Sequence, residues 1–180
     1  MLKIGTINLN GETWHLNRKI PRISRSILDK QKIKQQMTDV LNTQFGKILE
    51  SKEYDIIAVQ ELVYISEHYS KIENQINEKG YSLITPEKDI LIKNTHFITA
   101  FIIKNEIKDK IKPYDNSIEN NRFIIIKLLI EDEKEIAILN VHVNSNCEDE
   151  GIVSKESIQN VINTIKEEVF GLIILGDFNA

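Results

Sequence analysis

The sequence predicts an α/β domain with a mixed sheet arrangement. Short aliphatic runs alternate with amphipathic helical segments towards both ends of the chain, and between them lie consecutive aliphatic runs separated by short polar loops. The chain has 180 residues, 41% hydrophobic and 28% charged, which is enough for one domain with its own core. No internal repeat, low-complexity segment or linker interrupts it. We therefore predict a single domain over residues 1–180.

Each element follows from a local pattern. Strands are expected where aliphatic residues run together or alternate, at residues 2–7, 56–59, 81–85, 96–103, 123–130, 135–143 and 172–175. Helical spacing of apolar residues, with capping residues before them or a glycine after them, predicts helices at residues 33–48 (cap Asp29), 66–79 (stop Gly80) and 158–169 (cap Ser154, stop Gly171). Two long stretches without a periodic pattern remain, residues 9–28 and 105–121. Loops of that length in a compact domain are often functional.

Composition excludes several classes of protein. A single cysteine, Cys147, rules out an intrachain disulfide, and no Cys/His cluster suggests zinc. No apolar stretch reaches the length of a signal peptide or a membrane span. We therefore expect a cytoplasmic protein, unless an export signal has been removed, and we infer no obligate protein partner.

Charge is unevenly distributed along the chain. The net charge is −4, but residues 18–34 hold seven basic residues and one acid, a local charge of +6 that leaves −10 for the remainder. A basic segment on an acidic body could bind a phosphate backbone. It could equally be a solvated loop and helix face. Both interpretations are open at this point.

Polar groups end four of the predicted strands. Asn8, Glu61 and His142 each lie at the end of an aliphatic run, and Asp177 and Asn179 follow the last one. Taken singly, each has a plain explanation as a turn former, a helix cap or a hydrogen-bonded half-buried residue. Taken together, they would converge at one rim if the strands are neighbours, where open α/β sheets bind ligands. Their oxygen donors favour a metal such as Mg²⁺.

Five segments in this order resemble the endonuclease/exonuclease/phosphatase superfamily, the group of DNase I, the exonuclease III-type repair nucleases, neutral sphingomyelinases and inositol polyphosphate phosphatases. The segments are Ile4-Gly5-Thr6-Ile7-Asn8, Asp55-Ile56-Ile57-Ala58-Val59-Gln60-Glu61, Asn121-Arg122-Phe123, Leu139-Asn140-Val141-His142 and Leu175-Gly176-Asp177-Phe178-Asn179-Ala180. The resemblance implies a DNase I-like, four-layer αββα sandwich of two mixed β-sheets. It also implies hydrolysis of a phosphate ester that depends on Mg²⁺ or Mn²⁺.

The resemblance also implies roles for individual residues at the metal. Glu61 would be the main metal ligand, and Asn8 would support the metal and the phosphate from beside it. Asp177 would orient the attacking water or stabilise the transition state. His142 resembles the first active-site histidine of the DNase I and sphingomyelinase branch. A histidine can donate a proton or a hydrogen bond near neutral pH.

Other residues would contact the substrate. By the same resemblance, Arg122 and Asn179 would hold non-bridging phosphate oxygens, for which the guanidinium offers a planar fork. Period-two geometry puts Asn140, His142 and Asn144 on one face of their strand, so we expect Asn144 to contact substrate as well.

The sequence departs from the family pattern in one respect. Family members end with an Asp-His pair that supplies the general base, but no Asp precedes any histidine here, and the only histidines are His15, His68, His96 and His142. We therefore expect the domain to be incomplete at its C-terminus, as a fragment of a longer product, and we expect little hydrolysis by the chain itself. The alternative is a truncated, non-catalytic remnant that keeps the fold.

These observations predict a Mg²⁺-dependent phosphodiesterase, with a nuclease favoured. Trp14 lies in the same loop as Arg18, Lys19, Arg22 and Arg25, and bases can stack on an aromatic ring while cations hold phosphates. Packing within the loop would explain Trp14 equally well. A phospholipid or inositol-phosphate phosphoesterase of the same superfamily is the other enzymatic alternative.

Overall fold

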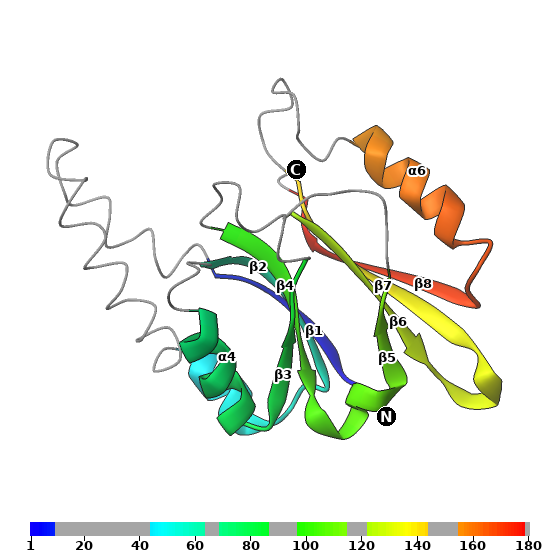
Figure 1. Cartoon of the computed structure of the whole chain (residues 1–180). Coiled ribbons are helices and arrows are strands. Elements are labelled where there is room, and N and C mark those ends of the chain that lie inside the picture. Colours follow the sequence, from blue (N-terminus) through cyan, green and yellow to red (C-terminus); the bar gives the residue numbers. More distant parts are fainter. Residues whose placement is uncertain (10–43, 64–68, 87–96, 115–121, 144–154, 179–180) are drawn as a thin grey trace, which may run out of the picture.

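Two four-stranded β-sheets face each other in the computed structural model of the chain (Figure 1). The structure describes residues 1–9, 44–63, 69–86, 97–114, 122–143 and 155–178. The basic segment at residues 18–34, most of the predicted loop at residues 9–28 and the predicted helix as far as residue 43 lie outside this part of the chain. So do His15, His68 and His96.

The first sheet has the strand order β1-β2-β4-β3. Its strands are β1 (Ile4–Asn8), β2 (Ile56–Val63), β3 (Tyr81–Ile84) and β4 (Phe97–Lys104). β1 runs parallel to β2, whereas β4 is antiparallel to both β2 and β3. The predicted mixed pairing is therefore present in this sheet.

The second sheet has the strand order β5-β6-β7-β8. Its strands are β5 (Ile111–Pro113), β6 (Phe123–Leu129), β7 (Glu135–His142) and β8 (Gly171–Asp177). β7 and β8 are parallel, and the other pairs are antiparallel. Both sheets thus combine one parallel pair with antiparallel pairs.

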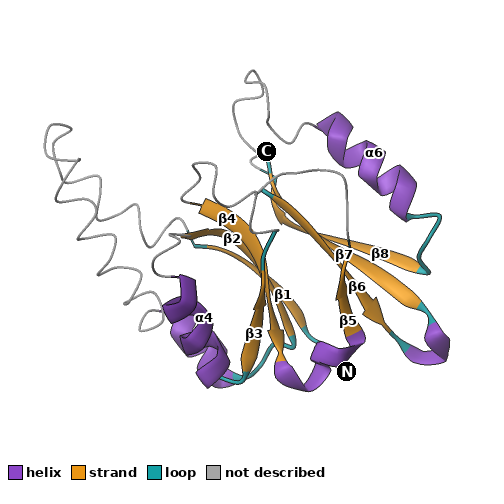
Figure 2. Ribbon diagram, in the orientation of Figure 1, coloured by secondary structure: helices purple, strands orange, loops and turns teal. Residues whose placement is uncertain are grey.

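Helices cover the outer faces of the two sheets (Figure 2). Helices α3 (Gln44–Ser51) and α4 (Tyr69–Glu78) pack on the first sheet, and α6 (Lys155–Ile165) packs on the second. Two 3₁₀ turns, η3 (Asn105–Lys110) and η4 (Glu131–Glu133), connect strands. This layering confirms the predicted αββα sandwich. None of the helices in the described ranges is long and apolar enough to cross a membrane.

The central strands are buried on both faces, which explains their uninterrupted aliphatic sequences. In β2, Ile56 and Ala58 pack between the sheets, whereas Ile57 and Val59 pack under α3 and α4. Partners from the facing sheet, including Ile126 and Ile138, complete the layer between the sheets. An apolar layer of this kind holds the sheets together.

Two sequence predictions are wrong in detail. Residues 105–121 were expected to lack structure, but residues 105–113 form η3 and β5, because Ile107 and Ile111 pack into the layer between the sheets. The last helix was expected to continue to residue 169 and stop at Gly171. Instead it ends at Ile165 and Gly171 begins β8, because the N–H of Phe170 already bonds to the carbonyl of Glu135 in β7.

Candidate active site

The carboxyl ends of β1, β2, β7 and β8 meet at one end of the sandwich, which we call the site end (Figure 1). β1 and β2 end there because they are parallel in the first sheet, and β7 and β8 because they are parallel in the second. At the site end, side chains from one sheet bind side chains from the other in three places. The predicted convergence of polar strand ends on one rim is therefore what the structure shows.

Glu61 from the first sheet binds His142 from the second. The Glu61 Oε1 lies 3.1 Å from the His142 Nε2, and the two side chains are only 11% and 7% exposed. A β-bulge in β2 between Val59 and Leu62 presents Glu61, whose φ is +55°. A bulge re-aims a side chain, and a positive φ is strained for a residue other than glycine. Strain of this kind is concentrated at functional sites.

Asn8 from the first sheet binds Asp177 from the second. The Asn8 Nδ2 donates a hydrogen bond of 2.7 Å to the Asp177 Oδ2. Since the amide nitrogen faces the carboxylate, Oδ1 is the Asn8 atom suited to a metal ion. The backbone also fixes Asp177, whose carbonyl accepts a 2.8 Å hydrogen bond from the N–H of Val143.

Gly176 allows β8 to approach β7 closely beside Asp177. Its φ is +140°, and a Cβ at this position would lie 1.8 Å from the carbonyl oxygen of Val141. No side chain larger than hydrogen fits there. The glycine of the Gly-Asp-Phe-Asn segment therefore has a structural cause that the sequence alone did not supply.

Gln60 and Asn140 make the third contact between the sheets. The Gln60 Nε2 donates a 2.6 Å hydrogen bond to the Asn140 Oδ1, and both residues are buried. Sequence reasoning placed Asn140 on the face of His142 but assigned it and Gln60 no contact. A polar residue within an aliphatic run, next to a predicted site residue in each strand, is the signal that could have identified them.

Arg122 lies at the same end, just before β6. Its carbonyl accepts a 2.8 Å hydrogen bond from the N–H of His142, and its side chain is half-buried. The structure therefore gathers the predicted residues Asn8, Glu61, Arg122, His142 and Asp177 at the site end. Asn144 and Asn179 lie outside the described residues, and their roles stay predictions.

The donor types at the site end fit a hard divalent cation. Within the described ranges, no group of three or more His, Cys, Asp or Glu side chains is placed to hold a metal ion. Mg²⁺, however, is usually bound by one or two carboxylates together with water and substrate phosphate, so a three-residue cage is not required. The Glu61 and Asp177 carboxylates and the Asn8 amide oxygen are side-chain oxygens of the type that such an ion accepts, and Glu61 and Asn8 are the ligands expected from the sequence.

Comparisons with known proteins agree with this architecture. No protein-family model and no curated protein matches the sequence. Among solved structures, a D. rerio TDP2 humanized by 14 mutations is 13% identical, with a TM-score of 0.58 over 99% of this chain and 62% of that chain. D. rerio TDP2 complexed with single-strand DNA product is 14% identical, with a TM-score of 0.51 over 80% of this chain and 55% of that chain.

A third structure, TDP2 from C. elegans, is 15% identical, with a TM-score of 0.50 over 79% of this chain and 44% of that chain. The chain therefore spans less than two thirds of each of these neighbours. At such low identity, likeness of this kind establishes the fold and not the activity. The chain has the DNase I-like fold, the four-layer sandwich that these structures share and that the sequence predicted.

Proposed function

We propose that this chain carries the metal-binding and phosphate-binding end of a Mg²⁺-dependent phosphodiesterase that acts on nucleic acid. One observation carries the proposal. The Glu61–His142 and Asn8–Asp177 contacts cross between the sheets side by side, and they bring two carboxylates, an amide and an imidazole to one end of the fold. Phosphoryl transfer depends mainly on positioning and charge stabilisation, which groups of these types can provide.

Each residue has a role in this proposal. Glu61 and Asn8 would hold Mg²⁺, which when bound would neutralise negative charge on a phosphoryl oxygen. His142 would hold the Glu61 carboxylate in place and donate to a phosphate oxygen or the leaving group. Asp177, oriented by the Asn8 amide, would accept a hydrogen bond from the attacking water. Arg122 would bind non-bridging phosphate oxygens.

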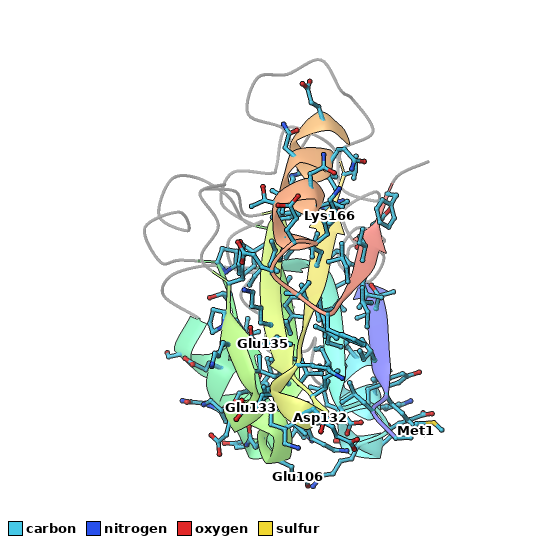
Figure 3. The ribbon with its side chains drawn as sticks, turned by 90° about the vertical axis from the view of Figure 1, so that its right-hand side faces the viewer. Met1, Glu106, Asp132, Glu133, Glu135 and Lys166 are labelled. Carbon is cyan, nitrogen blue, oxygen red and sulfur yellow. The ribbon has the colours of Figure 1, made fainter. Side chains whose placement is uncertain are left out.

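Nucleic acid is the favoured substrate. A structure with the same fold, TDP2 from D. rerio, is complexed with single-strand DNA product. The exposed acids Glu106, Asp132 and Glu133 lie at the end opposite the site end (Figure 3), where the exposed lysines Lys108, Lys110 and Lys134 accompany them. Hydrolysis rates on an oligonucleotide, a phospholipid and a small phosphate ester can be compared. Faster hydrolysis of the phospholipid or the small ester would contradict the choice of nucleic acid.

Metal binding provides the first test. Titration calorimetry with Mn²⁺ and Mg²⁺ should show binding to the chain, and Glu61→Gln should weaken that binding by about 100-fold or more, since even residues behind the ligands contribute about 10–100-fold. Glu53→Gln is the matched control, because Glu53 is an exposed carboxylate far from the site end, and it should bind as the parent chain does. Equal affinity in Glu61→Gln and the parent would remove Glu61 from the metal site.

Hydrolysis provides the second test. A fluorescent single-stranded oligonucleotide and bis-p-nitrophenyl phosphate should be cleaved only in the presence of the metal, with EDTA abolishing turnover. We expect slow turnover from this chain because it has no second histidine of the family type, and loss of a general base costs about 10²–10⁴-fold. Turnover that persists in both EDTA and Glu61→Gln would contradict the proposed mechanism.

A further inference from the structure

A buried polar network lies directly behind the Glu61–His142 contact. The Asn140 side chain crosses from β7 to the first sheet, where its Nδ2 donates hydrogen bonds of 2.9 Å to the Val59 carbonyl and 2.8 Å to the Ala100 carbonyl. Its Oδ1 accepts the 2.6 Å hydrogen bond from Gln60. Gln60 in turn donates to the Thr6 hydroxyl at 3.0 Å. One side chain of the second sheet is thus tied to β2 and β4, and through Gln60 to β1.

This network is a polar exception within an apolar layer. Most buried neighbours between the sheets are aliphatic or aromatic, such as Phe101, Ile126 and Ile138, although Thr99 of β4 is also buried. Asn140 is 0% exposed and Gln60 is 1% exposed, and the three hydrogen bonds of Asn140 are buried, whereas the Gln60–Thr6 hydrogen bond is partly exposed. Buried polar networks whose members are paired favour one arrangement of the surrounding elements, because hydrogen bonds are directional and an unpaired buried polar group is costly.

The network is attached to the backbone at the place where β2 bulges. The register between β2 and β4 shifts after the pair Val59–Ala100, and the carbonyls of these two residues are the ones that Asn140 binds. A bulge interrupts the regular ladder of hydrogen bonds. The Asn140 amide therefore binds both strands at the last regular pair before the irregularity, two residues from Glu61 and its positive φ.

We propose that Asn140, acting with Gln60, is a positioning residue that sets the place of Glu61 on the first sheet relative to His142 on the second. The metal-binding consequence rests on the proposed function, whereas the geometric consequence does not. The Glu61–His142 and Asn8–Asp177 contacts also join the sheets at the site end, but Asn140 is the residue bound to the β2 and β4 backbone beside Glu61. A misplacement of about 1 Å at a site can cost roughly 100-fold in rate, so a positional constraint of this kind has functional weight.

The test compares two buried positions on the same strand. Asn140→Leu removes the amide at similar volume, and Ile138→Ala, two residues earlier and also facing the first sheet, is the control for a general loss of core packing. Both variants are first checked for folding by circular dichroism. The metal-free readout is the three-bond coupling between the amide and α protons of Glu61 in ¹⁵N-labelled protein, which reports φ. The second readout is Mn²⁺ affinity by calorimetry.

We expect Asn140→Leu to change the Glu61 coupling and to weaken Mn²⁺ binding by about 10–100-fold, the usual effect of losing a residue behind a metal ligand. Ile138→Ala should leave both quantities unchanged. An unaltered Glu61 coupling in folded Asn140→Leu would overturn the inference. If Asn140→Leu does not fold, the test uses Gln60→Met, which keeps both carbonyl contacts of Asn140. This variant should change the Glu61 coupling by a smaller amount than a complete loss of the Asn140 amide. An unchanged Glu61 coupling in Gln60→Met would then overturn the inference.

The two proposals fail in different ways. A parent chain and a Glu61→Gln variant that bind Mn²⁺ equally weakly would defeat the proposed function, while the Glu61 coupling would still decide the positioning role. A parent chain that binds Mn²⁺ tightly and an Asn140→Leu variant that binds it as tightly with the same coupling would defeat the positioning role alone.

Discussion

Two carboxylates lie at opposite ends of the β2 region. Asp55 comes just before the strand and Glu61 lies near its carboxyl end, and the two differ in their hydrogen-bond partners and backbone conformation. Asp55 accepts hydrogen bonds from the Lys3 N–H at 2.8 Å and the Lys104 Nζ at 3.0 Å, and its backbone φ is not in the positive region. Glu61 has a φ of +55° and faces the imidazole of His142. We call the Asp55 side of the sandwich the ion-pair end.

Electrostatics at the ion-pair end indicate a structural role. Burial raises the pKa of Asp55, but the Lys3 N–H and the Lys104 ammonium together outweigh it and hold that pKa below its usual value of 3.8. The hydrogen bond to Asp55 raises the pKa of Lys104 against the opposing effect of burial. A carboxylate that is paired with a lysine ammonium group and a backbone N–H stabilises the fold. Glu61, by contrast, lies on strained backbone beside a histidine, and strain of this kind is concentrated at functional sites.

The largest expected effect concerns the two glycines of β8, one near each end of the sandwich. Gly176→Ala at the site end would place a Cβ 1.8 Å from the Val141 carbonyl oxygen at a φ of +140°. We expect a loss of about 3 kcal/mol or more in the free energy of unfolding, measured by urea denaturation, because overpacking and backbone strain add.

Gly171→Ala is the matched control for that variant. A Cβ at Gly171 would lie 3.4 Å from the Ile136 Cγ2. We therefore expect a change of about 1 kcal/mol or less. An equal loss in the free energy of unfolding for the two variants would mean that the close approach of β8 to β7 at the site end does not constrain Asp177. The two ends of the sandwich would then not differ in this respect.

An intermediate effect is expected at the ion-pair end. Asp55→Asn should lower the free energy of unfolding at pH 7 by about 1–2 kcal/mol, since it removes a charge-assisted hydrogen bond from Lys104 while keeping an acceptor for the Lys3 N–H. Because the folded-state pKa of Asp55 is depressed, its stabilisation is complete above pH 3.8 and is lost as the pH falls through the folded value. The parent and the variant should therefore converge in stability at low pH.

Glu53→Gln is the control for the Asp55 experiment. Glu53 lies 3.7 Å from the Lys3 Nζ with both side chains 55% exposed, so its removal should change stability by about 0.5 kcal/mol or less. A difference between the parent and Asp55→Asn that persists unchanged far below pH 3 would show that the carboxylate charge is not the source of the stabilisation.

Much of this comparison could be predicted from the sequence, because strands and strand ends are local features. The aliphatic runs located both halves of the sandwich, and the polar residues that end them, from Asn8 to Asp177, were placed together correctly. The η3–β5 segment was missed because its sequence is mostly charged, with only Ile107 and Ile111 as apolar contacts.

Contacts between the sheets could not be predicted in the same way. The pairing of Gln60 with Asn140, the bulge at Glu61 and the close approach at Gly176 all depend on how two sheets stack and how two strands are registered. Residue periodicity fixes the face of a side chain and not its partner across the layer. The sequence therefore predicted which polar residues meet at the site end, whereas the structure supplied the contacts between them.

The smallest expected effect concerns backbone strain at residues with a positive φ. It tests whether such strain can be removed at a position away from the site end. Lys52, at the ion-pair end, also has a positive φ, +51°, directly after α3. Lys52→Gly should raise the free energy of unfolding by about 0.5 kcal/mol, because glycine is favoured just after a helix and loses the steric penalty there. Glu53→Gly, at the next residue, where φ is not positive, should lower it by a similar amount, and urea denaturation distinguishes the two signs. Glu61 carries the same kind of strain, but a glycine there would also remove the carboxylate that binds His142. A destabilising Lys52→Gly would show that a positive φ is not costly in this fold, and the strain at Glu61 could then no longer be counted as a mark of function.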